Sequence, residues 1–252
     1  MRPLALLSAL LVGAVFAAGC SVQPPARLGA YLGSGIEAAQ ATPADFQALG
    51  KAQLQAGLLL INDTSLPNSA PALSQQGTAF LSDSVRRRIE DKTPIRLVKV
   101  LPSSGLTPQT AQQTVVSLGQ TQGVPYVLVV IFSSMESEIP LMLPATGDPE
   151  QGGGRPEVSG FEAINYALAE LALVETASGK VVARSEGRAW SRLNRLYAPI
   201  QSNAYPVIHR SQRVAPIFPK ENDAKDVLRG VAGDEALEQA VYQWEMAWSK
   251  SA

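Results

Sequence analysis

The first half of the chain alternates short apolar runs with amphipathic helical patterns, and this alternation constrains the fold more than any other feature. Residues 56–61, 95–101 and 125–132 are predicted strands, and the first is a continuous apolar run typical of a strand covered on both faces. Residues 72–90 and 107–123 show the spacing of amphipathic helices. Such a β-α-β-α-β series predicts parallel neighbouring strands joined by right-handed crossovers.

The second half predicts a β-hairpin. Residues 163–175 and 180–190 alternate along their length and flank a turn at residues 177–180. In the first arm the apolar side chains change faces near Glu170, which either a bulge or a change in the buried face would explain. In the second arm small residues alternate with larger ones, and we expect the small side chains to face inward.

An amphipathic helix ends the chain, with Asp234 as its expected N-cap. The apolar stripe that follows comprises Leu237, Ala240, Val241, Trp244 and Trp248. Together these elements predict an α/β fold. We expect a single domain over residues 54–252, built on a mixed sheet of about five strands with helices packed on it.

Two inserts interrupt this pattern, at residues 133–162 and 191–224. Loops of that length are uncommon inside a compact domain and usually carry a function or are disordered. Proline, which cannot donate to a strand ladder, recurs in both: Pro140, Pro144, Pro149, Pro199, Pro206, Pro216 and Pro219. We therefore expect both inserts to be contact loops, not membrane strands.

The N-terminus has the layout of an exported protein. Arg2 precedes an apolar stretch that ends in small residues just before Cys20, the single cysteine of the chain. Because this stretch is too short for a stable transmembrane helix, residues 1–19 are predicted to be a signal peptide. Residues 20–53 contain several prolines and glycines and predict a tether with little structure of its own.

The end of that leader, Ala17-Ala18-Gly19-Cys20, resembles the lipobox of bacterial lipoproteins. The resemblance implies cleavage before Cys20 and modification of its thiol and amine with lipid, palmitate among the acyl groups. Two or more acyl chains give lasting anchorage on a membrane. Ser21 stands where an aspartate would favour the inner membrane, so we expect the periplasmic face of the outer membrane.

Composition argues against several functions. The chain has 21 basic and 22 acidic residues, and removing residues 1–19 takes away Arg2 and leaves a net charge of −2. This near-neutral balance argues against a nucleic-acid partner. One histidine and one cysteine supply too few ligands for a zinc site, and Ser178-Gly179-Lys180 is a turn without the spacing of a phosphate-binding loop, so we expect no metal and no cofactor.

Catalytic patterns are weak. His209 is the single histidine, the sequence has no Gly-x-Ser-x-Gly nucleophile elbow, and we expect His209 to be a surface loop residue. Glu136 and Glu138 are spaced as paired carboxylates on one face of an extended segment. The same spacing describes a solvated face, which we favour. These patterns predict no enzyme activity.

The second insert is rich in tyrosine and arginine, residues that dominate binding hot spots. We predict a partner-binding surface there, made of Arg192, Arg195, Tyr197, Tyr205, His209, Arg210 and Arg213. A second basic cluster at residues 86–88 suits either the negative end of a helix dipole or a patch for lipid phosphate or an acidic partner, and we favour the first.

The order of these elements is similar to that of the curli-secretion-channel superfamily of lipoprotein domains. The resemblance rests on Asn62-Asp63 after the first strand, on residues 123–129 and on the hairpin at residues 167–182. The superfamily also includes lipoprotein activators of penicillin-binding proteins and exopolysaccharide-secretion lipoproteins. The resemblance implies a mixed sheet with helices on its faces, no enzyme activity and, often, ring assembly at the outer membrane.

The sequence therefore predicts a lipid-anchored, non-enzymatic scaffold or accessory subunit in export or cell-envelope assembly. Its expected partners are the membrane, through Cys20, and envelope or secretion proteins, while self-association stays open. Two alternatives also stay open. One is an envelope hydrolase that uses residues 191–224, and the other is a subunit of an oligomeric secretion pore.

Overall fold

The computed structural model describes residues 23–33, 49, 53–103, 106–144, 157–197 and 206–251. One six-stranded sheet lies at the centre of the fold, in the order β2-β1-β3-β4-β5-β6. The strands are β1 Leu54–Asp63, β2 Ile95–Val100, β3 Tyr126–Pro144, β4 Glu157–Glu175, β5 Val181–Leu196 and β6 Val207–Arg210. The predicted α/β class with a mixed sheet is confirmed, with one strand more than the five expected.

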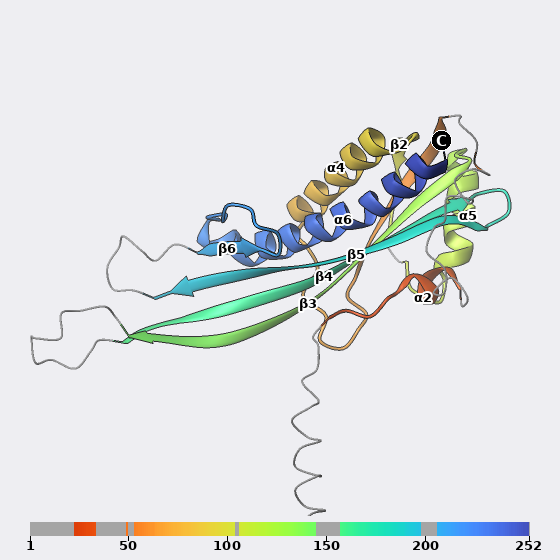
Figure 1. Cartoon of the computed structure of the whole chain (residues 1–252). Coiled ribbons are helices and arrows are strands. Elements are labelled where there is room, and N and C mark those ends of the chain that lie inside the picture. Colours follow the sequence, from red (N-terminus) through yellow and green to blue (C-terminus); the bar gives the residue numbers. More distant parts are fainter. Residues whose placement is uncertain are drawn as a thin grey trace, which may run out of the picture.

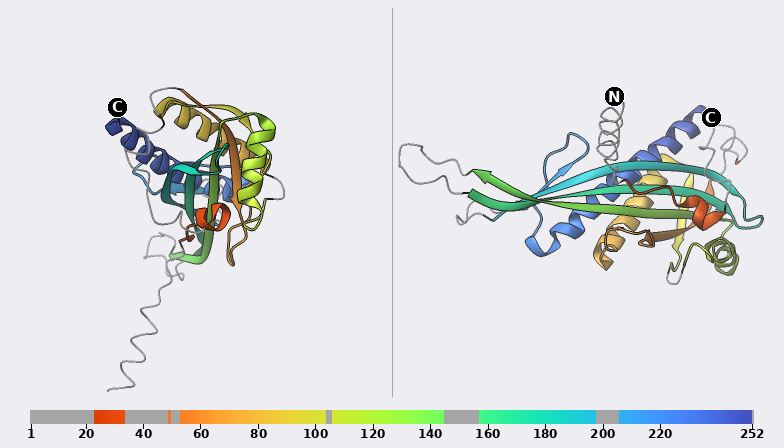
Figure 2. Two further views of the ribbon diagram at one scale, coloured as in Figure 1. Left: turned by 90° about the vertical axis from the view of Figure 1, so that its right-hand side faces the viewer. Right: turned by 90° about the horizontal axis from the view of Figure 1, so that it is seen from below.

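Helices cover both faces of this sheet. Four α-helices lie in the described ranges: α2 Leu28–Leu32, α4 Gln75–Lys92, α5 Ala111–Gln122 and α6 Ala224–Ser251. Helices α4 and α6 pack side by side on one face, and α2 and α5 pack on the other, as Figure 1 and the end-on view of Figure 2 show. The sheet is strongly twisted, and its longest strands reach well past the end of α4 (Figure 1).

The first half of the chain folds as the predicted β-α-β-α-β series. β1 pairs in parallel with β2 on one side and with β3 on the other. The chain therefore steps in opposite directions from β1 to β2 and from β2 to β3, so crossovers of the same hand place α4 and α5 on opposite faces. β1 is buried on both faces, as its continuous apolar run predicts, with Leu58 in the core under α4 and Leu59 in the core under α5.

The two predicted helices lie close to their expected bounds. α4 begins after Ser74, whose hydroxyl accepts a hydrogen bond from the Gly77 amide at 3.0 Å and so satisfies an N-terminal donor. α5 ends at Gly123, whose φ of 65° lies in the left-handed region that favours glycine.

The first insert is mostly strand, so the expectation of a loop is wrong there. β3 pairs with β4 without a break from Tyr126 opposite Glu175 to Pro144 opposite Glu157. β1 ends opposite Ser133, so β3 is an edge strand beyond that point except for one bridge to Ser69. Proline is tolerated on edge strands, which explains how β3 continues through its prolines. Residues 145–156 lie outside the described ranges.

The second insert is also partly strand. β5 continues to Leu196, and β6 pairs antiparallel with it through Ser191 opposite Arg210 and Asn194 opposite Val207. We refer to the part of β3, β4 and β5 beyond the end of β1, with β6, as the arm. β6 has only four residues, too few to give an alternation signal in the sequence.

The change of faces near Glu170 comes from a change in burial. The β3–β4 register is continuous through Glu170, and the one irregularity in the β4–β5 ladder lies between Leu173 and Val174. Residues 167–174 are buried on both faces because α2 and α5 cover the face that is open in the arm. Of the two explanations offered, the one that invokes the buried face is confirmed.

α6 begins ten residues before the expected N-cap. Asp234 lies inside the helix, where it accepts a hydrogen bond from Ser84 and pairs with Arg88 at 2.9 Å. The carboxylate is held by α4 and does not cap a helix. The apolar stripe is confirmed, since Leu237, Ala240, Val241 and Trp244 are buried and Trp248 packs against the same core.

The small residues of β5 face α6, as predicted. Ala183, Ser185, Gly187 and Ala189 are buried. A Cβ atom added to Gly187 would lie 2.0 Å from the carbonyl oxygen of Ala236, so glycine is what allows α6 to lie this close to the strand.

Candidate functional site

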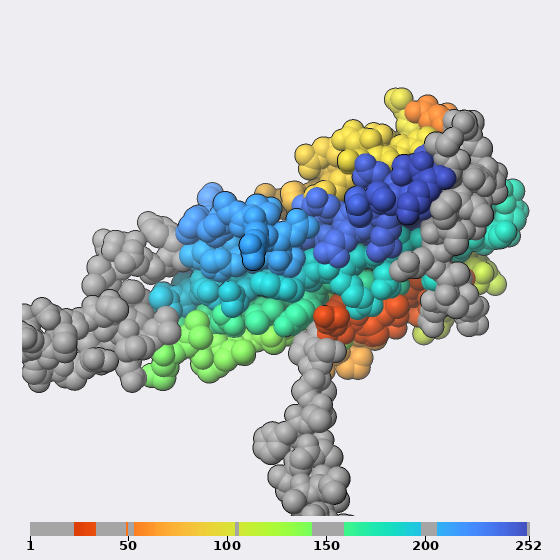
Figure 3. Space-filling model, viewed as in Figure 1, coloured from red at the N-terminus to blue at the C-terminus, as the bar shows by residue number. Residues whose placement is uncertain are grey.

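Residues 23–33, which we call the strap, cross the sheet on the face opposite α6. The sequence assigns them to an unstructured tether, and this expectation is wrong for the strap. Leu28, Tyr31 and Leu32 are each 3–4% exposed and pack in the core with α5. In the space-filling view the red strap lies directly beneath the teal and cyan strands (Figure 3). Residues 34–48 and 50–52 of the expected tether lie outside the described ranges.

Glu170 holds the beginning of α2. Its carboxylate accepts hydrogen bonds from the backbone amides of Arg27 at 2.7 Å and Leu28 at 3.1 Å, which no helical carbonyl can reach. Glu170 is 1% exposed. Burial is the largest influence and raises the pKa of Glu170 above its usual range, while the two amides oppose that change.

Asp63, the last residue of β1, holds the middle of the strap. Its carboxylate accepts hydrogen bonds from Arg27 Nε at 2.6 Å, from Tyr31 Oη at 3.1 Å and from Ser65 Oγ at 2.6 Å. Burial alone would raise the pKa of Asp63, but the hydrogen bonds from Ser65 and the Arg27 cation outweigh it and lower the pKa. Burial, followed by the neighbouring Asp63, raises the pKa of Tyr31 to about 12. Asp63 is thus a charged clamp.

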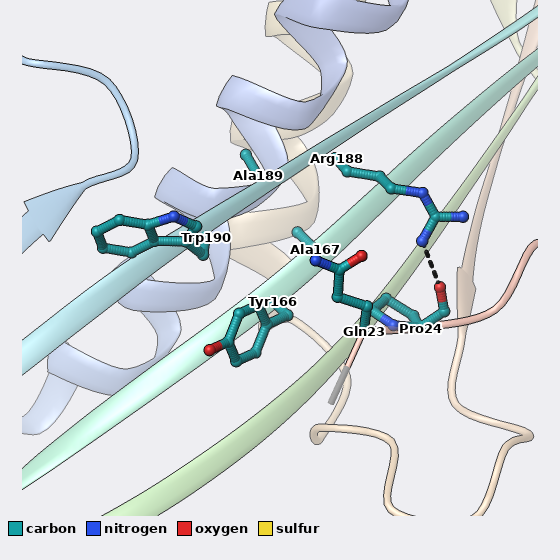
Figure 4. Close-up of a pocket in the computed structure, with 7 residues that line it drawn as sticks. All are labelled: Gln23, Pro24, Tyr166, Ala167, Arg188, Ala189 and Trp190. Carbon is teal, nitrogen blue, oxygen red and sulfur yellow. Dashed lines mark hydrogen bonds between the residues drawn. The ribbon is translucent and has the colours of Figure 1, made fainter. Parts of the chain in front are cut away.

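The N-terminal end of the strap is held by β5. Arg188 Nη1 donates a hydrogen bond to the Pro24 carbonyl oxygen at 2.8 Å. Figure 4 shows Gln23 and Pro24 beside Tyr166 and Arg188, where they border a pocket of about 50 Å³. Trp190, the ladder partner of Tyr166, completes that border.

The docked strap fixes where the N-terminus leaves the domain. Cys20 itself lies outside the described ranges, but only three peptide steps separate it from Gln23. Three extended residues span at most about 11 Å. A lipid carried by Cys20 would therefore hold this face of the sheet close to a membrane surface, which a free tether of some thirty residues would not do.

The predicted partner-binding residues do not form one surface. Ladder partners share a face of the sheet, so Arg192 and His209 lie together on the face away from α6, and His209 is in β6 and not in a loop. Arg195 and Arg210 alternate with them and lie on the α6 face. Arg213 is exposed after β6, and Tyr205 lies outside the described ranges.

Arg195 and Tyr197 do meet at the end of β5. The Arg195 guanidinium lies 5.1 Å from the centre of the Tyr197 ring and pairs with Glu221. Tyr197 also packs at 6.1 Å from the Phe161 ring. This cluster links β5, β4 and the short helix before α6, Glu221–Asp223, so its contacts stabilise the arm.

Glu136 and Glu138 are ion-paired, which corrects the expectation of a solvated face. Lys225 Nζ lies 3.1 Å from Glu136 and 2.6 Å from Glu138, and Arg229 lies 3.5 Å from Glu136. The hydrogen bond that Lys225 donates to Glu138 is the largest influence and raises the pKa of Lys225, with Glu136 adding to it. Both carboxylates thus form ion pairs with cations near the N-terminus of α6.

A groove opens between the N-terminal ends of α4 and α6 and the loop after β6. Its volume is about 890 Å³. Ile217, Val227 and Val231 line it, and Phe80 at its border is 44% exposed. Of the predicted binding residues that the structure describes, only Arg210 reaches this groove. Polar side chains also line it, among them Asp223, Asp226 and Asp234. A concave surface that combines apolar and polar side chains can serve as a binding site.

The described residues contain neither a metal-binding cluster nor a membrane-spanning helix. No set of three His, Cys, Asp or Glu side chains gathers as a metal site would require. No helix in the described ranges combines the length and the apolar character needed to cross a bilayer.

The residues that hold the strap were not predicted from the sequence. The sequence marks Asp63 as the end of a strand and Glu170 as a break in alternation, and neither pattern points to the strap. Their hydrogen-bond partner Arg27 lies 36 residues from Asp63 and 143 residues from Glu170 along the chain. A charged residue inside an apolar strand pattern is the one signal that marks both positions.

The sequence matches no protein-family model, and it matches no curated protein. Among solved structures, the chain is similar to PelC from Paraburkholderia phytofirmans, a dodecamer, at 11% identity over 77% of this chain and 88% of that chain with a TM-score of 0.34. It is similar to the C-terminal domain of LpoB from Salmonella enterica at 16% identity over 59% and 94% of the two chains with a TM-score of 0.28. It is also similar to lipoprotein GNA1162 from Neisseria meningitidis at 12% identity over 58% and 88% of the two chains with a TM-score of 0.26. At TM-scores below 0.5, these likenesses assign neither a family nor a function to the chain.

Proposed function

We propose that this protein is a lipid-anchored, non-enzymatic accessory protein of the cell envelope, which holds a partner-binding domain at a membrane in a defined orientation. The observation that carries this proposal is the strap. It is clamped to the sheet by Asp63, Glu170 and Arg188, beginning three residues after the cysteine that a lipobox would modify.

The buried contacts of the strap favour a fixed attachment of the domain over a flexible tether. A flexible tether needs no buried carboxylates, because burying a charge costs free energy unless that charge is well paired. Here Glu170 and Asp63 are both buried, and each accepts at least two hydrogen bonds from the strap. The contacts favour a domain whose position relative to its anchor matters.

The groove between α4 and α6 is the partner site that we propose. It lies on the opposite face of the sheet from the strap, so a domain held by the strap presents the groove away from the membrane. Phe80, large and 44% exposed, is the side chain we expect to enter a partner surface. We place the partner among export or envelope-assembly proteins.

Site-specific photocrosslinking in intact cells tests this function. A photoreactive residue at Phe80 is expected to capture an export or envelope-assembly protein, whereas one at Tyr242, which is 57% exposed on the same helix pair, is not. Replacing residues 1–20 with a leader that is cleaved without lipidation is expected to release the protein from the membrane and to abolish the Phe80 crosslink. A Phe80 crosslink of full strength in that released variant would contradict anchored presentation.

A further inference from the structure

The face of the arm turned away from α6 carries apolar side chains, and no described helix covers it. In the view from below, the strands of the arm lie in front, with α4 and α6 behind them (Figure 2, right). Two rows of ladder partners on this face are Met135, Tyr166 and Trp190, followed by Ser137, Ile164, Arg192 and His209. We call this surface the open face. Trp190 is 36% exposed and Ile139, farther along the same face, is 50% exposed.

The strap leaves the domain at the edge of this face. Gln23 and Pro24 border the same small pocket as Tyr166 and Trp190, as Figure 4 shows. Cys20 can lie at most about 11 Å from Gln23. The headgroup layer of one leaflet is roughly 5–8 Å thick. A lipid on Cys20 therefore brings the open face, and not the α6 face, to the membrane surface.

The composition of the open face suits a membrane interface. Tryptophan and tyrosine are enriched where the headgroups meet the hydrocarbon, since one part of each ring system is apolar and another is polar. Tyr166 and Trp190 lie side by side on adjacent strands, and Ile139 and Ile164 add aliphatic surface to the same face.

The charges on this face nearly cancel. Arg192 lies 3.6 Å from Glu162. An attraction of the open face to lipid would therefore come from its aromatic and aliphatic side chains. It would depend little on the anionic lipid content, unlike the attraction of a polybasic patch.

We propose that the open face of the arm rests in the headgroup layer of the membrane that holds Cys20, with Trp190 at the level of the interface. This inference rests on the proposed function because it requires a lipid at Cys20. A second copy of the chain is the competing occupant of the open face, and the experiment distinguishes the two.

Quenching of tryptophan fluorescence by brominated lipid tests the inference. The full-length mature protein, purified with its lipid, is reconstituted into phosphatidylcholine vesicles that carry bromine on the acyl chains near the headgroups, or into unbrominated vesicles. The chain has three tryptophans, and Trp244 and Trp248 belong to α6 on the other face. They serve as internal controls, and W190F removes the reporter while keeping an aromatic ring.

We expect bromine to quench part of the wild-type emission and to have no effect on W190F. The quenching should be about equal in vesicles with and without phosphatidylglycerol. Equal quenching of wild type and W190F, or none in either, would overturn the inference. Shielding of Trp190 from aqueous iodide without any bromine effect would overturn it in favour of a protein contact.

Failure of this inference is distinguishable from failure of the proposed function. Flotation of the same vesicles reports whether the protein is anchored, independently of Trp190. Protein that floats with the vesicles while Trp190 stays unquenched leaves the anchored function standing and removes the open-face contact.

Discussion

Two buried carboxylates, Glu170 and Asp63, hold the strap by different physical means. Glu170 accepts uncharged amide donors and remains costly to ionise, so its pKa is raised. Asp63 faces the Arg27 cation and two hydroxyl donors, so its pKa is lowered. The Asp63 contact therefore weakens as the pH falls and its carboxylate is protonated. Protonation of Glu170, in contrast, removes the cost of burying its charge.

Glu170 predicts a specific pH dependence of stability. Its folded pKa lies above the usual 4.5, so its contribution is fully present below that pH and is lost as the pH rises through the raised value. Thermal melts across this range should show wild type losing stability relative to E170Q, which cannot ionise. A constant difference between the two proteins at every pH would contradict a raised pKa.

Replacing Asp63 is expected to lower the free energy of unfolding, and the size of the change depends on where the side chain lies. D63A should lower the free energy of unfolding by about 2 kcal/mol, because Arg27 and Tyr31 lose a buried acceptor while Arg27 can still reach water. The matched control is D83A on α4, where the side chain is exposed and the expected change is within about 0.5 kcal/mol. Denaturant titration measures both, and equal losses would show that Asp63 is not a clamp.

Asp63 and Glu170 show which residue contacts the sequence does not predict. Asp63 and Glu170 break apolar patterns, which marks them as unusual. The sequence does not show that both face Arg27, because each pair is brought together only by the folded sheet. The solvated face expected for Glu136 is wrong for the same reason, since Lys225 approaches it from a helix expected to begin later.

At the scale of elements, the approach of α6 to β5 depends on one glycine. Gly187 lies where the helix backbone is closest to the strand, and a side chain there would meet the Ala236 carbonyl. Gly230, inside α6, has a different environment: an added Cβ would have its nearest contact at 3.9 Å, with Phe80.

Replacing these two glycines with alanine is expected to change the free energy of unfolding in opposite directions. G187A should destabilise the fold by about 1–3 kcal/mol, because strand and helix must move apart. G230A should stabilise it by up to about 1 kcal/mol, because alanine fits there and is the better helix former. Chemical denaturation of both variants checks this, and a neutral G187A would show that α6 does not pack so closely.

The elements that were predicted are those with strong local periodicity. The apolar run of β1 and the stripe of α6 each contain enough residues to fix their type. β6 and the first ten residues of α6 were missed because their burial depends on contacts with the arm. Most of the arm is predicted as loops, apart from the part that belongs to the predicted hairpin, because its prolines are compatible with strands only at an edge, and edges are a property of the assembled sheet.

For the molecule as a whole, the proposed function makes the strap the link between a lipid at Cys20 and the orientation of the groove. Its N-terminal end and the open face lie on one side of the sheet, and the groove lies on the other. The distance between Cys20 and the first clamped residue should therefore affect the orientation of the groove more than the length of the chain after the strap does.

Lengthening the chain on either side of the strap tests this asymmetry. Fifteen Gly and Ser residues inserted between Val22 and Gln23 should leave the protein on the membrane but abolish the Phe80 crosslink, because the domain can then rotate freely. The same insert between Ala41 and Thr42 lies beyond the strap and should change neither property. Equal effects of the two inserts would show that orientation plays no part.

Hydrogen exchange of the Arg27 and Leu28 amides in the full-length mature protein shows whether the strap is clamped, because both amides donate to Glu170. If the strap is clamped, both amides exchange much more slowly than those of an unstructured peptide, and E170A restores fast exchange. Fast exchange of both amides in the wild-type protein would show that the strap is not held on the sheet.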